Sequence, residues 1–180
     1  GNFLFPVPSG FLALCSDNRP EPDIGPNSET QAVDHFGILT YTGDDTDNRA
    51  IVSGGTGIGG EINFTPDWLW HKARNSGTNF HFLYDSTRGV DKVLTTVDTS
   101  SEVTSTTDLD SFDANGFTVD DESGNRDLNA SAHTYVTWLW KANGGTTSSN
   151  EDGTITSTVQ ANTTAGFSIV TYTGDGTNNR

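Results

Sequence analysis

The sequence predicts an all-β protein, an antiparallel β-sandwich or jelly roll. Several short segments, such as residues 80–85 and 134–142, alternate between two kinds of side chain in the way that strands do. Turn-forming Gly, Asn, Asp and Ser residues separate these segments at short intervals. No segment shows the apolar spacing of an amphipathic helix.

One stretch of sequence occurs twice. Phe36–Arg49 returns as Phe167–Arg180, and Thr40–Asp44 recurs unchanged as Thr171–Asp175. An apolar run that leads into Tyr-Thr-Gly-Asp indicates a strand that ends in a turn. Its recurrence at a domain-sized distance predicts that residue 167 opens a second copy of the unit that residue 36 opens.

We therefore expect the chain to be part of a longer tandem protein, an expectation that the absence of Met supports. Its predicted parts are the end of a preceding β-domain (1–22), a Pro-rich linker (23–33), a central sandwich (34–166) and the first strand of a following repeat (167–180).

The elements of the central module follow from local patterns. Residues 50–60 hold five Gly and predict a flexible turn, because no Gly-Lys-Ser/Thr follows that would bind phosphate. Residues 143–160 predict either a long excursion or a pair of strands. The expected strands are 36–42, 67–73, 80–85, 92–97, the hairpin 109–119 with its turn at 114–116, and 134–142.

Trp68 and Trp70 share one face of their strand, and Leu69, His71 and Ala73 share the other. We expect the indoles to face the core because they are the largest apolar side chains. The predicted core is Ile38, Leu39, Tyr41, Trp68, Trp70, Phe82, Tyr84, Val93, Leu94, Phe112, Phe117, Val119, Tyr135, Val136, Trp138 and Trp140.

The net charge of −15 argues against a phosphate-binding nucleic-acid protein, which needs clustered Lys and Arg. No apolar stretch reaches the roughly 18 residues of a membrane span. The Thr-, Ser-, Gly-, Asn- and Asp-rich composition is typical of extracellular β-proteins. A solvated, acidic, extracellular surface is the interpretation that we favour.

No motif predicts catalysis, so we expect a protein that is not an enzyme and has no cofactor. The sequence lacks the Gly-x-Ser-x-Gly and His-Glu-x-x-His motifs. His71 and His81 could meet on adjacent strands, on the face opposite the aromatic residues, but polar residues of a solvated sheet face are the expected interpretation.

A calcium site is the one metal hypothesis. Asp44, Asp45 and Asp47 lie in Thr42–Asn48, which is a cluster of hard oxygen donors. The second copy, residues 173–179, lacks two of these carboxylates, so such a site would not be a shared property of the repeat.

Two segments resemble known families. Residues 3–15 and the exit Asn18-Arg-Pro-Glu-Pro22 resemble the closing segment of SPRY-type domains of large bacteriophage virion proteins, with Arg19 where Leu is usual. Residues 64–74, 83–89, 109–119 and 133–142 together resemble a repeated module of tailed-phage virion structural proteins. That resemblance implies a concanavalin-like or laminin-G-like sandwich, without catalytic residues.

Two functions are open at this point. The first is a structural and adhesion module of a phage fibre, spike or surface decoration, at the virion surface. Its partners would be other virion proteins, copies of itself in a homo-oligomer, or host-surface glycans. The alternative is a carbohydrate-binding, lectin-like module of a secreted or cell-surface protein, which would need aromatic residues outside the core.

Overall fold

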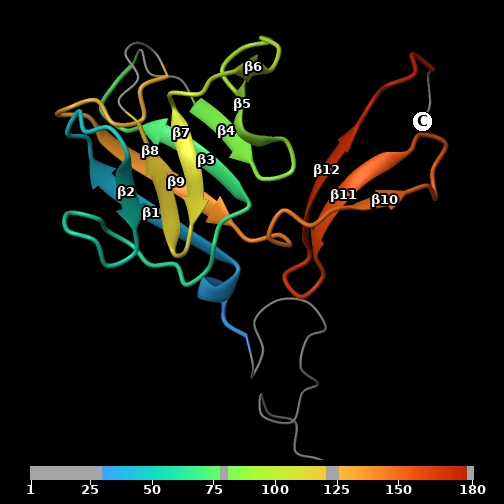
Figure 1. The fold of residues 1–180 in the computed structure, drawn as a ribbon, viewed down its shortest axis with the longest axis horizontal. Coiled ribbons are helices and arrows are strands. Elements are labelled where there is room, and N and C mark those ends of the chain that lie inside the picture. Colours follow the sequence, from blue (N-terminus) through green and yellow to red (C-terminus); the bar gives the residue numbers. More distant parts are fainter. Residues whose placement is uncertain (1–29, 78–80, 121–125, 178–180) are drawn as a thin grey trace, which may run out of the picture.

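The computed structural model describes residues 30–77, 81–120 and 126–177, and it is nearly all β in these ranges (Figure 1). A single 3-10 turn, η2 (Ala32–Asp34), precedes the first strand. The ladders between neighbouring strands are antiparallel, as predicted. The all-β antiparallel fold is therefore confirmed, whereas the jelly-roll connectivity stays a prediction.

A six-stranded sheet forms one layer of the sandwich. Its strand order is β1-β9-β3-β4-β5-β6. Strand β9, which comes late in the chain, lies between β1 and β3, so residues about 70 to 100 positions apart share one ladder. The strands are β1 (Phe36–Thr42), β3 (Trp68–Ala73), β4 (His81–Asp85), β5 (Gly89–Thr95), β6 (Val103–Thr104) and β9 (Thr134–Trp140).

A three-stranded sheet forms the second layer and lies in front of the first in Figure 1. Its strand order is β2-β8-β7, with β2 (Arg49–Val52), β7 (Leu109–Asp113) and β8 (Gly116–Val119). The predicted hairpin 109–119 is confirmed, and Asn115 takes the left-handed conformation (φ 63°) that its turn requires. Strand β2 was not predicted, because it lies at the start of the Gly-rich segment.

The core lies between these two sheets. Alternate residues of each strand face it, as in Leu39 and Tyr41 of β1 and Phe82 and Tyr84 of β4. The buried cluster is Leu39, Tyr41, Ile51, Ile62, Phe64, Leu69, Ala73, Phe82, Tyr84, Val93, Leu109, Phe117, Val119, Leu128, Tyr135 and Leu139.

The predicted core is half right. Leu39, Tyr41, Phe82, Tyr84, Val93, Phe117, Val119 and Tyr135 are buried as expected. The prediction is wrong for the residues of the opposite sheet face, and Phe112 only packs against the edge of the cluster. The misplaced residues are Ile38, Trp68, Trp70, Leu94, Val136, Trp138 and Trp140, none of which is buried.

A third sheet stands beside the sandwich (Figure 1). It consists of β10 (Ser148–Asn150), β11 (Ser157–Asn162) and β12 (Phe167–Tyr172), in that order. Residues 143–160 thus contain the strand pair, not the long excursion. The repeated strand β12 pairs with β11 and not with the six-stranded sheet.

No helix in the described ranges is long and apolar enough to cross a membrane. Residues 1–22, with Cys15, and the linker up to Glu29 lie outside the described residues. The predicted division of the chain into domains therefore stays a prediction.

Candidate functional site: the outer aromatic face

All four Trp residues of the chain lie on the outer face of the six-stranded sheet. Register explains this placement: Trp70 of β3 is paired with Trp138 of β9, and Trp68 is paired with Trp140. On the other side of β3, Trp70 is paired with Leu83, so the indoles share a face with Leu83 and not with Phe82. Both Trp pairs consequently point away from the core.

The indoles form one continuous group of contacts. The ring centroids are 4.5 Å apart for Trp68 and Trp140, in an edge-to-face arrangement, and 5.2 Å apart for Trp70 and Trp138. Trp68 and Trp70 lie 6.5 Å apart and join the two pairs. Phe36 extends the group at the β1 side, with its centroid 4.7 Å from that of Trp140. We call Phe36, Ile38, Trp68, Trp70, Trp138 and Trp140 the outer aromatic face.

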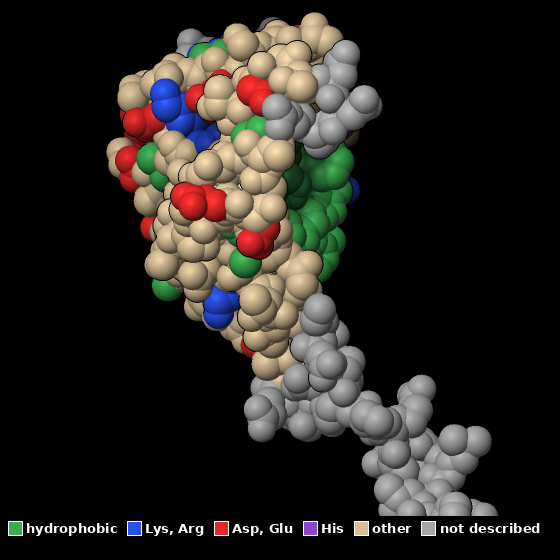
Figure 2. Space-filling model, turned by 90° about the vertical axis from the view of Figure 1, so that its right-hand side faces the viewer, with side chains coloured by type: hydrophobic (Ala, Val, Ile, Leu, Met, Phe, Trp, Pro, Cys, Tyr) green, Lys and Arg blue, Asp and Glu red, His purple; other side chains and the backbone are tan. Residues whose placement is uncertain are grey.

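The outer aromatic face is in contact with solvent. Its Trp residues are half-buried, and Ile38 is 39% exposed. Figure 2 shows a continuous hydrophobic surface along one side of the molecule, at the side where the outer face of the six-stranded sheet lies. Such a patch on a solvated sheet marks an interaction surface more often than a free surface.

Polar side chains lie next to the indoles. Two residues further along the strands from the Trp70–Trp138 pair is the next row of side chains on the same face. Thr40 of β1, Lys72 of β3 and His81 of β4 lie in this row. Partial burial, together with the Lys72 ammonium, lowers the pKa of His81. At neutral pH this row therefore offers a hydroxyl, a cation and a neutral imidazole beside the aromatic rings.

His71 and His81 lie on opposite faces of the sheet, so they do not meet, and the expected solvated position is wrong for His71. His81 contacts Trp70 on the outer face, with the ring centroids 6.2 Å apart. His71 lies in the core, where its Nδ1 is 2.8 Å from Oγ1 of Thr137. Burial, and to a lesser extent Lys72, lowers the pKa of His71 to about 3. His71 is therefore a neutral core residue.

The three carboxylates of the calcium hypothesis have protein partners. Asp44 pairs with Arg49 at 3.3 Å and accepts a hydrogen bond from Nδ2 of Asn129 at 3.0 Å. Partial burial opposes the charged form, but the hydrogen bonds from Asn129 and Thr46 and the Arg49 charge outweigh it and lower the pKa of Asp44. Asp45 accepts a hydrogen bond from the backbone of Ser131, and Asp47 is exposed.

Within the described ranges, no three His, Cys, Asp or Glu side chains are grouped so that they could hold a metal ion. Sequence reasoning missed the role of Asn129, which is fully buried and bridges Asp44 and Arg49 from a segment about 80 residues away. The calcium site at Asp44, Asp45 and Asp47 stays a prediction.

A buried polar junction fixes the third sheet to the sandwich. Asp67 accepts backbone hydrogen bonds from Ala142, Gly144 and Gly145 at 2.7–3.0 Å. Gln160 of β11, also fully buried, accepts from the backbone of Gly145 at 2.8 Å. The carboxylate and the amide together hold the loop that follows β9. Sequence alone gave no sign of this pairing, because Asp67 and Gln160 are isolated polar residues in different segments.

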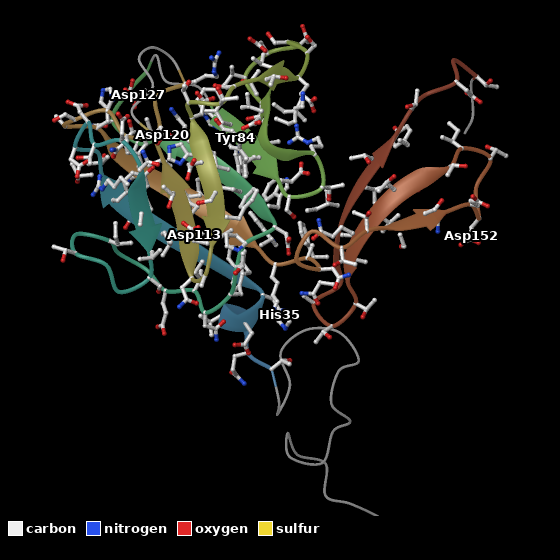
Figure 3. The ribbon with its side chains drawn as sticks, in the orientation of Figure 1. His35, Tyr84, Asp113, Asp120, Asp127 and Asp152 are labelled. Atoms are coloured by element: carbon white, nitrogen blue, oxygen red, sulfur yellow. The ribbon has the colours of Figure 1, made fainter. Side chains whose placement is uncertain are left out.

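A second junction lies at the entry of the chain into the sandwich. Nδ2 of Asn162 is 2.8 Å from Nδ1 of His35 and donates to the carbonyl of Lys141 at 3.1 Å. His35 stands between the sandwich and the third sheet (Figure 3). The ring of Phe167 stacks on the indole of Trp140 beside it. The outer aromatic face therefore reaches the base of β12.

A model of one protein family, described as a domain of unknown function (DUF7483), matches residues 31–180. The chain belongs to this family. The match takes in the sandwich and the third sheet of this DUF7483 domain together, including both copies of the repeated strand. No curated protein and no solved structure matches the chain.

Proposed function

We propose that this DUF7483 domain is a non-enzymatic structural and adhesion module at the surface of a bacteriophage virion, and that the outer aromatic face is its contact surface. The observation that carries the proposal is the position of the four Trp residues, which lie outside the core on a solvated sheet. When a partner covers such a surface, its apolar side chains are removed from water, which lowers the free energy of the complex.

The composition of the face supports a role in contacts. Trp is among the residues most enriched at the centre of protein interfaces, and it presents a large rigid area at a low cost in side-chain entropy. The virion assignment rests on the resemblance of residues 64–142 to phage structural modules and on the repeated strand. Tandem copies of such a face would multiply weak contacts into avidity.

A second candidate is a carbohydrate-binding module of a secreted or cell-surface protein. It is favoured by the indoles outside the core, which it requires, and by the polar row of Thr40, Lys72 and His81 beside them. Sugar rings stack on indoles through their C–H faces, and their hydroxyls need hydrogen-bonding groups at the edge of the stack. The two candidates share one surface and differ in the chemistry of the partner.

Tryptophan fluorescence tests the proposal directly, because every Trp of the chain lies on the outer aromatic face. We would first identify ligands on a glycan array, with and without calcium, and by co-purification with other virion proteins. Each ligand would then be titrated against the emission of the wild type and of Trp70→Ala/Trp138→Ala. Val97→Ala is the control, since it removes an exposed apolar side chain that belongs to neither the outer aromatic face nor the third sheet.

We expect ligand binding to shift the emission, and the double variant to lose binding while Val97→Ala keeps it. Ligands that bind without any change in emission, and equally well to the double variant, would show that the outer aromatic face is not the contact surface. Binding of glycans alone would favour the carbohydrate-binding candidate.

A further inference from the structure

Strand β12 repeats the sequence of β1 but lies in the opposite environment. The core-facing residues of β1 are Leu39, which is fully buried, and Tyr41, which is 3% exposed. Their counterparts in β12 are Val170, which is 48% exposed, and Tyr172, which is 69% exposed. The apolar side chains that face the core in β1 are thus kept on a side of β12 that is exposed here.

The turn after β12 already has the conformation of the turn after β1. The backbone N–H of Thr46 donates to Oδ1 of Asp44, and the N–H of Thr177 donates to Oδ1 of Asp175 in the same way. The residue between them takes a left-handed conformation in both copies, with φ 57° at Asp45 and 74° at Gly176. β12 and its turn therefore match β1 in shape as well as in sequence.

Nothing around Gly174 in the described part of the chain requires a glycine at this position. Its counterpart Gly43 needs to be glycine, because a Cβ there would lie 2.1 Å from the carbonyl oxygen of Ala130. At Gly174 a Cβ would meet nothing within 4 Å, and the backbone is not left-handed. A glycine at position 174 becomes necessary only when a segment such as 129–130 packs against it.

The exposed side of β12 borders a hollow. Val170 and Tyr172 line it together with Asn150, Ile155 and Ser157, and its volume is about 630 Å³. β12 is also the end strand of its sheet, so one of its edges has no strand partner among the described residues. The unpaired edge of β12 provides backbone groups that another strand could pair with, and the exposed Val170 and Tyr172 provide apolar side chains that could be buried in the process.

We propose that β12 is the first strand of a second sandwich: its free edge pairs with β9 of another copy of this module, in the place that β1 takes here, and Val170 and Tyr172 face the core of that copy. The occupant is a second module copy because β1, which has the same side chains, pairs with β9 through its whole length, from Phe36 opposite Trp140 to Thr42 opposite Thr134. The proposal does not depend on what the outer aromatic face binds.

A tandem fusion tests this. Because Arg180 is the counterpart of Arg49, the full chain is continued after Arg180 with a second copy of residues 50–180, which has no β1 of its own. We expect this second copy to fold on β12, and the amides of 167–177 to exchange at least about tenfold more slowly than in the single chain. Amides that exchange equally fast in both proteins would overturn the proposal.

Two substitutions separate docking from general stability. In the single chain, Tyr172→Asp and Gly174→Val are expected to leave the melting temperature unchanged, whereas Tyr41→Asp in β1 prevents folding. In the fusion, each β12 substitution is expected to abolish folding of the second copy and to leave the first intact. A second copy that folds equally well with either substitution would show that it does not use β12.

Discussion

The ring of Phe167 stacks on the indole of Trp140, with the centroids 6.0 Å apart and the planes 22° from parallel. This contact joins the third sheet to the outer aromatic face. We expect Phe167→Ala to remove about 0.5–1.5 kcal/mol of packing and to loosen β11 and β12, which Gln160 and Asn162 still hold, without unfolding the sandwich. Hydrogen exchange should show faster amides in 157–172 only, and faster exchange throughout the sandwich would contradict this.

The inner face of β9 is predicted to matter more for stability than the outer face. Leu139→Ala removes a fully buried side chain and should lower the free energy of unfolding by about 2–5 kcal/mol. Trp138→Ala removes a larger but half-exposed side chain and should cost about 1–2 kcal/mol. Urea unfolding followed by far-UV circular dichroism compares the two, and a greater loss for Trp138→Ala would place the indole in the core.

His71 is predicted to make the protein less stable in acid. Its pKa is about 3 in the folded state, against about 6.5 when unfolded, so the unfolded chain binds the extra proton between these values. The His71 contribution is complete above about pH 6.5 and is lost as the pH falls toward 3, at about 1.4 kcal/mol per pH unit.

His71→Gln keeps a polar group near Thr137 and removes this titration. The difference in unfolding free energy between wild type and variant, measured by urea titration at several pH values above 5, should shrink as the pH falls. A constant difference would mean that the pKa of His71 is the same in the folded and the unfolded chain.

Asp67 is predicted to hold the loop after β9. Asp67→Ala leaves the backbone N–H groups of Ala142 and Gly144 without their acceptor, and Gly145 keeps only its hydrogen bond to Gln160. Loss of these charged hydrogen bonds should cost roughly 1.5–3 kcal/mol in thermal unfolding. Asp152→Ala, which changes an exposed carboxylate, is the control and should have no measurable effect.

Contrary to the calcium hypothesis for Asp44, Asp45 and Asp47, we predict from the contacts of Asp44 that calcium does not stabilise this domain. Asp44 forms an ion pair with Arg49 and accepts a hydrogen bond from Asn129, so binding of the ion would require the loss of these interactions. Melting temperatures with calcium and with chelator should agree. A rise with calcium that Asp44→Asn abolishes would support the metal hypothesis instead.

The sequence predicted the strands better than their faces. Hydrophobicity alone places Val136, Trp138 and Trp140 inside, yet Tyr135, Thr137 and Leu139 are the residues that face the core. The choice depends on the pairing of Trp70 with Leu83 across β3 and β4, and on the buried contact of Thr137 with His71. Apolar residues on both faces of β3 and β9 were the available signal that the outer side of these strands is apolar as well.

The long-range polar contacts could not be predicted. Asn129 lies in a segment that looks like an ordinary polar loop, and its role depends on the arrival of Asp44 and Arg49 from the end of β1 and the start of β2. Gln160 is equally inconspicuous, although its position beside Gly145 orients the third sheet. Such contacts depend on tertiary placement and leave no local pattern.

The pairing of Phe36 with Trp140 has a mechanical consequence. The chain enters the sandwich at β1 and leaves it at β9, and these two ends are adjacent, since the backbone N–H of Lys141 donates to the carbonyl of His35 at 2.9 Å. Tension along the chain would pass through this short bridge and through Asn162, which holds both residues. The rest of the sandwich lies to one side of the line of force, so it would experience tension only after this bridge has opened. The hydrogen bonds between β1 and β9 would then break one at a time, starting from the Phe36–Trp140 end.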